Sequence, residues 1–291
     1  MQLLKNCKFL LLIAALCAFS ACSVGKNSSE ADFLSFVENS PDCFCNSLAW
    51  ESVCDGIDYA FYKNAEVPVR LHILKISLSE RNLDLFAYPE NNCTVLKGVS
   101  TKKIAKSKGA VVAFNTTPFS CGLSNSLFER IFSKRRRLVG IHSVLENIIA
   151  DPVKSYDALL FYRDKDGYFA EIANQGDSAC IQADFAFGGF WQILCSGKKI
   201  PFAEYYDART ACGISKDKRT LFVLVAEKSF SSRGLSYNEC AGLFLLLGAV
   251  NAIELDGGSS SSLFVDGQIK NYVSTPVNVA AVVGFRVKKT D

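Results

Sequence analysis

The chain has 291 residues, of which 49% are apolar and 22 are phenylalanine, and it carries a formal net charge of +3 at pH 7. This apolar content excludes a disordered chain, and the length is enough for one large domain or two small ones. The small net charge gives no reason to expect a nucleic-acid partner.

The first 22 residues predict an export signal. Lys5 and Lys8 precede an apolar run over residues 9–19, and the small residues Ser20 and Ala21 stand directly before Cys22. The run is about half as long as the roughly 20 residues that a membrane-spanning helix needs, so it is typical of a secretory signal. Small residues followed by cysteine are typical of a lipoprotein processing site. Ordinary secretion with an incidental cysteine is the alternative.

We therefore predict a lipoprotein signal peptide at 1–22, lipidation at Cys22 and a polar tether at 23–40. A folded domain is expected over residues 41–291. This arrangement implies a protein held at the bacterial cell envelope by its N-terminal lipid, which contacts the membrane and leaves the domain facing the periplasm or the cell surface.

The first half of the domain predicts two hairpins separated by a helix and a strand. Alternating apolar residues over 67–88, interrupted at 79–82, predict the first hairpin. A short basic helix is expected over 101–107, closing at Gly109, and a buried strand over 110–114 that ends at Asn115. Residues 158–162 and 168–172 predict the second hairpin, with its turn at Asp166 and Gly167.

The last third predicts a unit of strand, helix and strand. Residues 220–226 suit a buried strand, Ser236 and Glu239 form a capping-box pattern, and the helix that follows stops at Gly248. A strand over 252–255 leads into glycines and serines, and a further strand over 263–265 ends at a turn. Strands, hairpins and a crossover helix together predict an α+β fold, with a mixed β-sheet flanked by helices in a single large domain.

Two further patterns bear on ligands. The chain contains only two histidines, and Cys43-Phe44-Cys45 lacks the two-residue spacing of a typical zinc pair, so we expect neither a metal nor another cofactor. The basic run at 134–137 precedes a strand-like stretch. A solvated strand edge is the favoured interpretation of this run, and a polyanion-binding site is the alternative.

The segment over residues 253–262 carries the strongest indication of chemistry. Asp256 ends a buried strand, at the edge of a sheet where clefts form. Gly257 and Gly258 permit positive φ angles and close approach of a ligand, and the amides and hydroxyls of the four serines that follow suit an anion. The pattern indicates a sugar or phosphate pocket beside a carboxylate. A glycine-rich hairpin in which Asp256 caps a turn is the alternative.

Several short motifs follow one another from residue 209 onward. They are Arg209-Thr-Ala-Cys-Gly213, Gly234-Leu-Ser-Tyr-Asn-Glu239, Gly248-Ala249 and Leu255-Asp-Gly-Gly-Ser-Ser260, followed by Asn271 and Pro276. Their order and spacing resemble the phosphodiester glycosidase family. The resemblance implies a glycoside hydrolase that cleaves a sugar-1-phosphodiester bond, with a carbohydrate or sugar phosphate as its substrate.

The resemblance also implies roles for the charged residues. Cleavage at an anomeric carbon passes through an oxocarbenium-like state that needs a nearby carboxylate, and we predict Asp256 as nucleophile or base. Glu254 lies two residues earlier on the same face of the strand, as a second carboxylate or a structural ion-pair partner. Glu227 is a third candidate acid or base. Arg209 is predicted to bind the phosphate bidentately, with a structural ion pair as the alternative.

Other residues are predicted to contact the substrate. Asn115, at the end of its strand, is expected to hydrogen-bond a sugar hydroxyl. His142 is a further candidate, for which a structural role is the favoured interpretation. The remaining candidates would shape the pocket; they are Thr210, Gly257, Gly258, Ser259, Ser260 and Asn271.

The chain departs from the family pattern at a few positions. Thr116 and Thr117 replace two glycines, Ser259 replaces a third, and Thr275 stands where arginine is frequent. Ala-Glu-Lys around Glu227 replaces Asp-Gly-Arg. The departures at 116–117 favour a second hypothesis, a non-catalytic lipoprotein that holds envelope glycans or anionic polymers in the same cleft. A purely structural envelope protein is a third, and two glycines after a buried acid argue against it.

Overall fold

The computed structural model describes residues 33, 41–91, 96–121, 135–145 and 147–288. The predicted signal peptide with Cys22, and the predicted tether apart from Phe33, lie outside these residues. Phe33 is fully buried and its ring lies 6.2 Å from that of Tyr62, so this part of the expected tether packs on the domain. The described residues from Phe33 onward belong to one compact unit.

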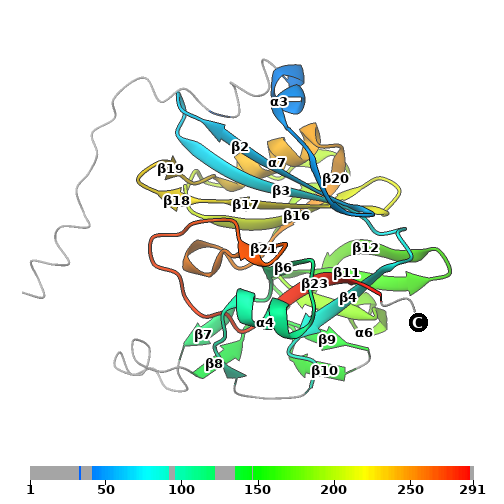
Figure 1. Ribbon diagram of the computed structural model, residues 1–291. Helices are drawn as coiled ribbons and strands as arrows, with labels where there is room; N and C mark the ends of the chain where they lie inside the picture. Colours follow the sequence, from blue (N-terminus) through cyan, green and yellow to red (C-terminus); the bar gives the residue numbers. More distant parts are fainter. Residues whose placement is uncertain (1–32, 34–40, 92–95, 122–134, 146, 289–291) are drawn as a thin grey trace, which may run out of the picture. The chain divides into compact units, whose positions relative to one another are not determined.

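Most of the fold is β-structure, arranged in several sheets (Figure 1). The largest has eight strands, in the order β1 (Glu51–Cys54), β2 (Ile57–Asn64), β3 (Val69–Ser77), β17 (Thr220–Ala226), β16 (Arg209–Ser215), β20 (Ala249–Glu254), β14 (Gln192–Cys195) and β15 (Lys198–Lys199). One five-stranded sheet has the order β10 (Asn147–Ala150), β9 (His142–Val144), β13 (Phe185–Gly188), β11 (Asp157–Asp164) and β12 (Gly167–Asn174).

Three smaller groups of strands complete the fold. A second five-stranded sheet has the order β22 (Gln268–Ile269), β21 (Leu263–Val265), β6 (Val112–Asn115), β23 (Val282–Val287) and β4 (Leu83–Tyr88). A three-stranded sheet has the order β5 (Leu96–Lys97), β8 (Arg135–Leu138) and β7 (Phe119–Cys121). The last pair is β18 (Lys228–Ser229) with β19 (Ser232–Arg233).

The helices of the described segments are few and short. They are α3 (Pro41–Ser47), α4 (Thr101–Ser107), α6 (Ala179–Gln182), α7 (Tyr237–Leu246) and the 3-10 turn η1 (Gly258–Ser260). None of the helices in these segments has the length and apolarity needed to cross a membrane. The capping box predicted at the start of α7 is present, because the Ser236 side chain accepts from the Glu239 amide and the Glu239 side chain accepts from the Ser236 amide.

The predicted mixed sheet is wrong in strand direction. Every ladder between the described strands is antiparallel, and the one parallel contact is an isolated bridge between Lys228 and Val273. Strands β17 and β20 both pair antiparallel with β16, which lies between them, so they run parallel to each other. Helix α7 lies between these two strands in the chain and is therefore the crossover helix that the sequence predicts. The expected flanking helices are reduced to α7 on the large sheet and the shorter α4 and α6 on the smaller ones.

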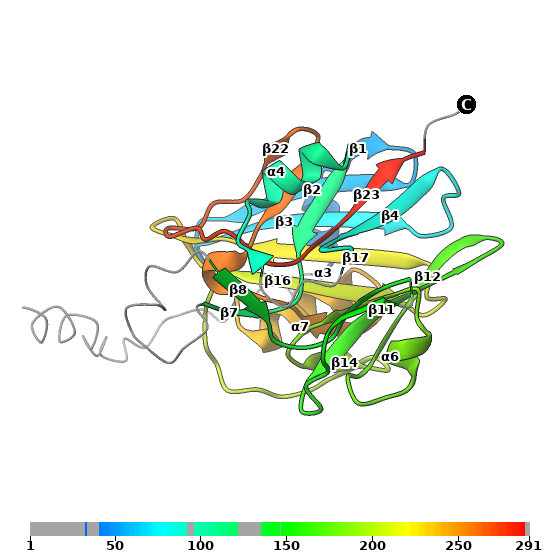
Figure 2. The same cartoon turned by 90° about the horizontal axis from the view of Figure 1, so that it is seen from below.

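The hydrophobic core has two layers, one on each face of the eight-stranded sheet. One face of the eight-stranded sheet packs against both five-stranded sheets through residues such as Ile253, Phe187 and Phe114. Its other face is covered by α7 through Leu243 and Phe244. Figure 1 shows the large sheet above the two smaller ones, and Figure 2 shows the same layers from below.

One predicted hairpin is confirmed and the other is wrong. Strands β11 and β12 pair from Asp157 to Asn174 around a two-residue turn at Lys165 and Asp166, one residue before the predicted turn. Strand β3 instead pairs with β2 and β17, while β4 pairs with β23 in a different sheet. The chain therefore passes from one layer to the other at residues 78–82, where the sequence pattern suggests a turn within one sheet.

Candidate active site

The loop after β20 lies where the large sheet meets a smaller one. The Asp256 amide donates to the Thr116 carbonyl (3.0 Å), which directly follows β6. The Gly258 amide donates to the Ala208 carbonyl (2.7 Å), which directly precedes β16. The loop is thus held by the main chain of two different sheets, and this fixes the position of the Asp256 side chain.

Asn115 holds the same loop from beneath. Its Nδ2 donates to the Asp256 carbonyl (2.5 Å), and its Oδ1 accepts from the Thr210 hydroxyl (2.9 Å) and the Ser262 amide (2.9 Å). Asn115 and Thr210 are both fully buried. The structure therefore contradicts their predicted contacts with substrate, because their polar atoms are used to join β6, β16 and the loop.

Gly257 and Gly258 are each required at their positions, but for different structural reasons. A Cβ on Gly257 would lie 3.0 Å from the Ala208 carbonyl oxygen, and Gly258 has a φ of +59° at the start of η1. The turn directs Ser260 back towards Asp256, whose carboxyl it hydrogen-bonds. Ser259 points outward and its hydroxyl lies 3.1 Å from that of Thr275. The predicted positive φ is present at Gly258, whereas Gly257 is explained by close packing against the main chain of Ala208, where the sequence pattern predicts close approach of a ligand.

Asp256 combines partial exposure with an unusual protonation equilibrium. Burial of most of its surroundings raises its pKa from 3.8 to about 7, against the opposing hydrogen bond from Ser260. A carboxyl group that titrates near neutral pH can either donate or accept a proton under working conditions. Among the predicted catalytic residues, Asp256 is the one that is partly exposed, whereas Glu227 and Glu254 are buried.

Glu254 is a different kind of buried acid. Burial raises its pKa to about 7, against the charge of Arg209 and the Cys240 thiol, which favour the ionised form. Neither carboxyl oxygen makes a hydrogen bond of normal geometry. The side chain is fully buried and lines neither cavity at the loop. The structure therefore places Glu254 in the interior, whereas Asp256 is partly exposed, although it too lines neither cavity.

Arg209 does not present its guanidinium to the loop. Its Nε donates to the Leu235 carbonyl (2.9 Å), and one Nη donates to the Tyr205 carbonyl (2.5 Å). Its Cζ lies 4.3 Å from the ring centroid of Tyr237. The Nε and Nη edge of the guanidinium is therefore occupied by main-chain carbonyls, the side chain is buried, and its charge favours the ionised form of Glu254. This placement counts against the predicted phosphate contact.

Glu227 is saturated by its neighbours. It accepts from Arg70 Nε (2.8 Å), His72 Nε2 (2.9 Å) and the Tyr272 amide (3.0 Å). Burial opposes its ionisation, but the hydrogen bonds from His72 and Tyr272 and the charge of Arg70 hold its pKa below the ordinary value. A carboxylate held in its ionised form cannot act as a proton donor, so the structure contradicts the predicted acid role. Glu227 anchors the segment at Tyr272 instead.

The last two predicted contacts are also structural. His142 is fully buried, its Nε2 lies 3.0 Å from the Pro89 carbonyl, and burial lowers its pKa to about 4, so it stays neutral. Asn271 donates to the Ser261 carbonyl (2.8 Å) and accepts from the Leu263 amide (2.7 Å). It shapes the serine loop from the inside, as Asn115 does from the other end.

Two cavities open on the serine loop. The larger cavity has a volume of about 520 Å³. It is lined by Ser260 and the other serines of the loop, and by residues within 100–102 and 269–278. The smaller, of about 240 Å³, is lined by Gly258, Ser259, Asp207 and Lys228. Lys228 Nζ lies 3.4 Å from the Asp207 carboxylate. Sequence reasoning missed Asp207, although it stands two residues before the first motif, and Lys228, which it treated only as a departure.

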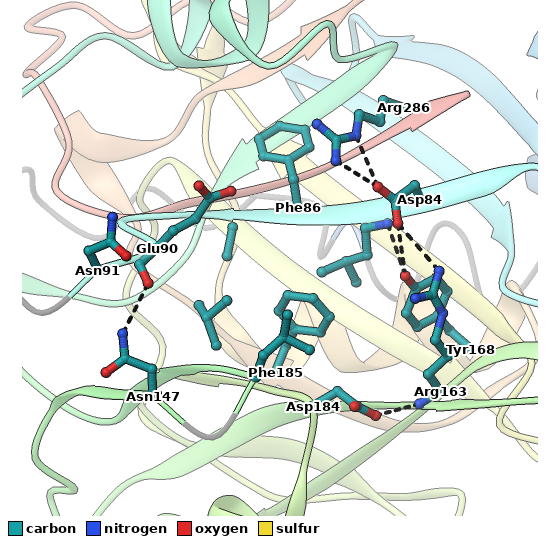
Figure 3. Close-up of a pocket in the computed structure, with 14 residues that line it drawn as sticks. Asp84, Phe86, Glu90, Asn91, Asn147, Arg163, Tyr168, Asp184, Phe185 and Arg286 are labelled. Atoms are coloured by element: carbon teal, nitrogen blue, oxygen red, sulfur yellow. Dashed lines mark hydrogen bonds and ion pairs between the residues drawn. The ribbon is translucent and has the colours of Figure 1, made fainter. Parts of the chain in front are cut away.

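A further cavity, of about 440 Å³, lies away from this loop (Figure 3). In it, Asp84 accepts from Arg286 (2.7 and 3.0 Å), from Tyr168 (3.3 Å) and, more distantly, from Arg163 (3.5 Å). Figure 3 shows the two arginines approaching Asp84 from different sides. Because Asp84 and the two arginines are paired with one another, these charged groups are less available to bind or react with a substrate than those at the serine loop. Across the described segments, no cluster of His, Cys, Asp and Glu side chains is arranged to hold a metal ion.

Comparison with known proteins shows the family of the chain and solved structures that share its fold. Residues 128–286 match the phosphodiester glycosidase family, and because the match spans more than half of the chain, the protein belongs to that family. It is 35% identical over 83 residues to the SPbeta prophage-derived uncharacterized protein YomE of Bacillus subtilis (strain 168). The match covers 28% of this chain and only 13% of YomE.

Three solved structures share the fold at low sequence identity. A hypothetical protein from Synechocystis has a TM-score of 0.61 at 14% identity, over 83% of this chain and 64% of its own. A putative exported protein from Burkholderia pseudomallei has a TM-score of 0.58 at 12% identity, over 78% and 74%. The zebrafish N-acetylglucosamine-1-phosphodiester alpha-N-acetylglucosaminidase catalytic domain, auto-inhibited by its pro-peptide, has a TM-score of 0.57 at 18% identity, over 84% and 85%.

Proposed function

We propose that the protein is a glycoside hydrolase that cleaves sugar-1-phosphodiesters, with Asp256 as the carboxyl group that reacts at or beside the anomeric carbon. Membership of the phosphodiester glycosidase family supports the reaction class. The observation that carries the assignment of Asp256 is a carboxyl whose pKa burial raises to about 7, on a partly exposed residue of a loop fixed by two sheets.

The chemistry needs little more than one such group. Phosphate is already a reasonable leaving group, so the difficult part of the reaction is the positive charge that develops at the anomeric carbon. The ionised form of Asp256 would stabilise that charge or activate a water, and the hydrogen bond from Ser260 favours this form. Arg209 is buried, whereas Lys228 is exposed and lines the smaller cavity beside Gly258, so we assign Lys228 to the phosphate. Its contacts with the Asp207 carboxylate (3.4 Å) and the Tyr206 carbonyl (2.8 Å) would give way to the ligand.

We also propose that the protein acts at the bacterial cell envelope, anchored by a lipid on Cys22. The basic and apolar residues before Ser20-Ala21-Cys22 support export and processing at that position. One protein with the same fold is described as a putative exported protein.

A second candidate function is non-catalytic binding of glycans or anionic polymers in the same cavities. Two observations favour it, because Glu227 is saturated by structural partners and Arg209 is bound to main-chain carbonyls. Both hypotheses need the serine loop, but only the first needs Asp256 to change its protonation state.

The test is turnover of a soluble sugar-1-phosphodiester by wild type and by Asp256→Asn, with Asp266→Asn on an exposed turn as the matched control. We expect Asp256→Asn to lower kcat by about a hundredfold or more, as loss of an acid–base group does, and Asp266→Asn to change it little. The wild-type rate should change with a pKa near 7. Equal turnover by wild type and Asp256→Asn would refute the assignment, and glycan binding without turnover would favour the second function.

A further inference from the structure

The two cavities at the serine loop adjoin one another. Ser259, Val273 and Ser274 line both of them. Ser259 also fastens the loop to the chain that follows β21, because its hydroxyl lies 3.1 Å from that of Thr275 and its carbonyl accepts from the Val277 amide (3.1 Å). The cavities are therefore neighbouring compartments of one site, and a ligand that passes Ser259 can occupy both.

The two cavities differ in their chemistry. The smaller one is lined by Lys228, the exposed cation that we assign to the phosphate. Apart from exposed Lys102, the described residues that line the larger one are uncharged. They include the serines of the loop and the exposed apolar side chains of Ile269, Tyr272 and Val277. Hydroxyl groups beside apolar surface match a sugar ring, which has hydroxyls around its edge and C–H bonds on its faces.

The larger cavity is also lined by residues whose hydroxyl groups lack a partner. Thr101 and Ser261 both line it and are each 2% exposed. Neither Thr101 Oγ1 nor Ser261 Oγ makes a hydrogen bond with another described residue. Buried polar groups are normally paired, so these two favour a ligand that has hydroxyls of its own. The alkyl chain of a lipid would fill the apolar part of the cavity but leave both hydroxyls unpaired.

The main chain of Tyr272 is fixed, although the residue is 57% exposed. Its amide donates to Glu227 Oε1 (3.0 Å). Glu227 is buried and also accepts from His72 (2.9 Å) and Arg70 (2.8 Å). An aromatic ring on a fixed main chain loses little conformational freedom on binding, which suits it to stack against the apolar face of a sugar.

The boundary between the two cavities lies beside Asp256. Ser260, which hydrogen-bonds the Asp256 carboxyl, lines the larger cavity, and its neighbour Ser259 lines both. Figure 1 shows the chain after β21 beside β18, the strand that begins with Lys228. A sugar in the larger cavity and a phosphate in the smaller one would therefore place the bond between them near Ser259 and Ser260, close to the reacting carboxyl.

We propose that the larger cavity binds the sugar ring of the substrate and that Tyr272 is the side chain on which this ring stacks. This inference rests on the proposed function, which assigns the reacting carboxyl and the phosphate contact but no site for the sugar. Because the described lining is uncharged apart from Lys102, ring stacking and hydroxyl contacts are the interactions through which the cavity recognises the sugar.

The test measures ligand binding by the full-length wild type and four variants. Tyr272→Ala removes the ring but keeps the amide that Glu227 binds, and Tyr272→Phe keeps the ring. Lys228→Gln removes the phosphate contact, and Trp50→Ala, at an exposed aromatic residue outside both cavities, is the matched control. The probes are methyl glycosides of the common hexoses and N-acetylhexosamines, the corresponding sugar 1-phosphates, inorganic phosphate and octyl phosphate.

We expect Tyr272→Ala to bind the sugar ligands of wild type about tenfold more weakly, because the stacked ring is lost, and to bind inorganic phosphate as wild type does. Tyr272→Phe and Trp50→Ala should match wild type for every probe. Lys228→Gln should lose affinity for phosphate and for the sugar 1-phosphates but keep its affinity for the methyl glycosides.

Equal binding of the methyl glycosides by wild type and Tyr272→Ala would overturn the proposal, and so would failure of wild type to bind any of them. An effect of Tyr272→Ala confined to octyl phosphate would place an alkyl chain in the cavity and overturn it as well. None of these measurements needs turnover. A protein that binds sugars through Tyr272 but cleaves no phosphodiester would therefore refute the proposed function and leave the sugar site standing.

Discussion

Replacement of Glu254 by glutamine tests whether the buried acid is ionised inside the folded protein. Burial raises the pKa of Glu254 from 4.5 to about 7, so the folded protein keeps a proton that the unfolded chain releases. Stability must therefore fall as pH rises between these two values. Glutamine has the same shape and does not ionise, so Glu254→Gln should avoid this loss.

The magnitude follows from the width of that interval. Between pH 5 and pH 8 the pKa difference corresponds to about 2 to 3 kcal/mol at roughly 1.4 kcal/mol per unit. We expect Glu254→Gln to have nearly wild-type stability at pH 5 and to be more stable by about 2 to 3 kcal/mol at pH 8. Asp256 titrates over the same range in both proteins, so its contribution cancels in the comparison.

Urea unfolding at the two pH values, under reducing conditions, measures the effect. Glu66→Gln, at an exposed position, is the matched control and should show the same difference from wild type at both pH values. If Glu254→Gln differed from wild type by the same amount at pH 5 and pH 8, the acid would not be held neutral. The account of its burial beside Arg209 would then be wrong.

Three further predictions concern packing, the loop and the N-terminus. Gly213→Ala should destabilise the protein by about 1 to 3 kcal/mol in urea unfolding, because the new Cβ would lie 2.4 Å from the Phe244 ring; an unchanged midpoint would contradict the tight packing of α7 on the sheet. Asn115→Ala should cost about 2 to 3 kcal/mol and lower turnover, because buried partners at the Asp256 loop lose their hydrogen bonds; full activity would show that the loop holds its shape without them. Cys22→Ala should move the protein from the membrane fraction to the soluble or precursor fraction, and continued lipid labelling would disprove lipidation at that residue.

The features that the sequence predicts well are the local ones. The capping box of α7 and the β11–β12 hairpin depend on residues a few positions apart, whose preferences act before any tertiary contact forms. The pairing of β3 and β4 failed because both strands alternate equally well. Strand β3 in fact forms a local hairpin with β2, while its other partner, β17, and the partner of β4, β23, lie more than a hundred residues away. Alternation shows that a strand has one buried face but does not show which strand lies beside it.

In the candidate site, too, the local features could be predicted from the sequence and those that depend on distant residues could not. The Asp256-Gly257-Gly258 loop could be predicted because a strand end, an acid and two glycines are adjacent in the chain. The roles given to Glu227 and Asn115 could not, since each depends on partners supplied by distant strands. A carboxylate or amide at a strand end is equally able to bind a ligand or to fasten two sheets together. Here the three hydrogen bonds of each side chain decide for the second role.

The substitutions at 116 and 117 can now be judged from the backbone. Neither Thr116 nor Thr117 has a positive φ, and Thr116 holds Asp256 through its carbonyl oxygen, which any residue would provide. Gly258, by contrast, has a φ of +59°, and Gly257 approaches a main-chain oxygen too closely for a larger residue to fit freely. The glycines that the Asp256 loop requires are therefore the ones that are present. The loss of glycine at 116–117 leaves the support of Asp256 intact, so it weighs less against catalysis than the sequence pattern suggests.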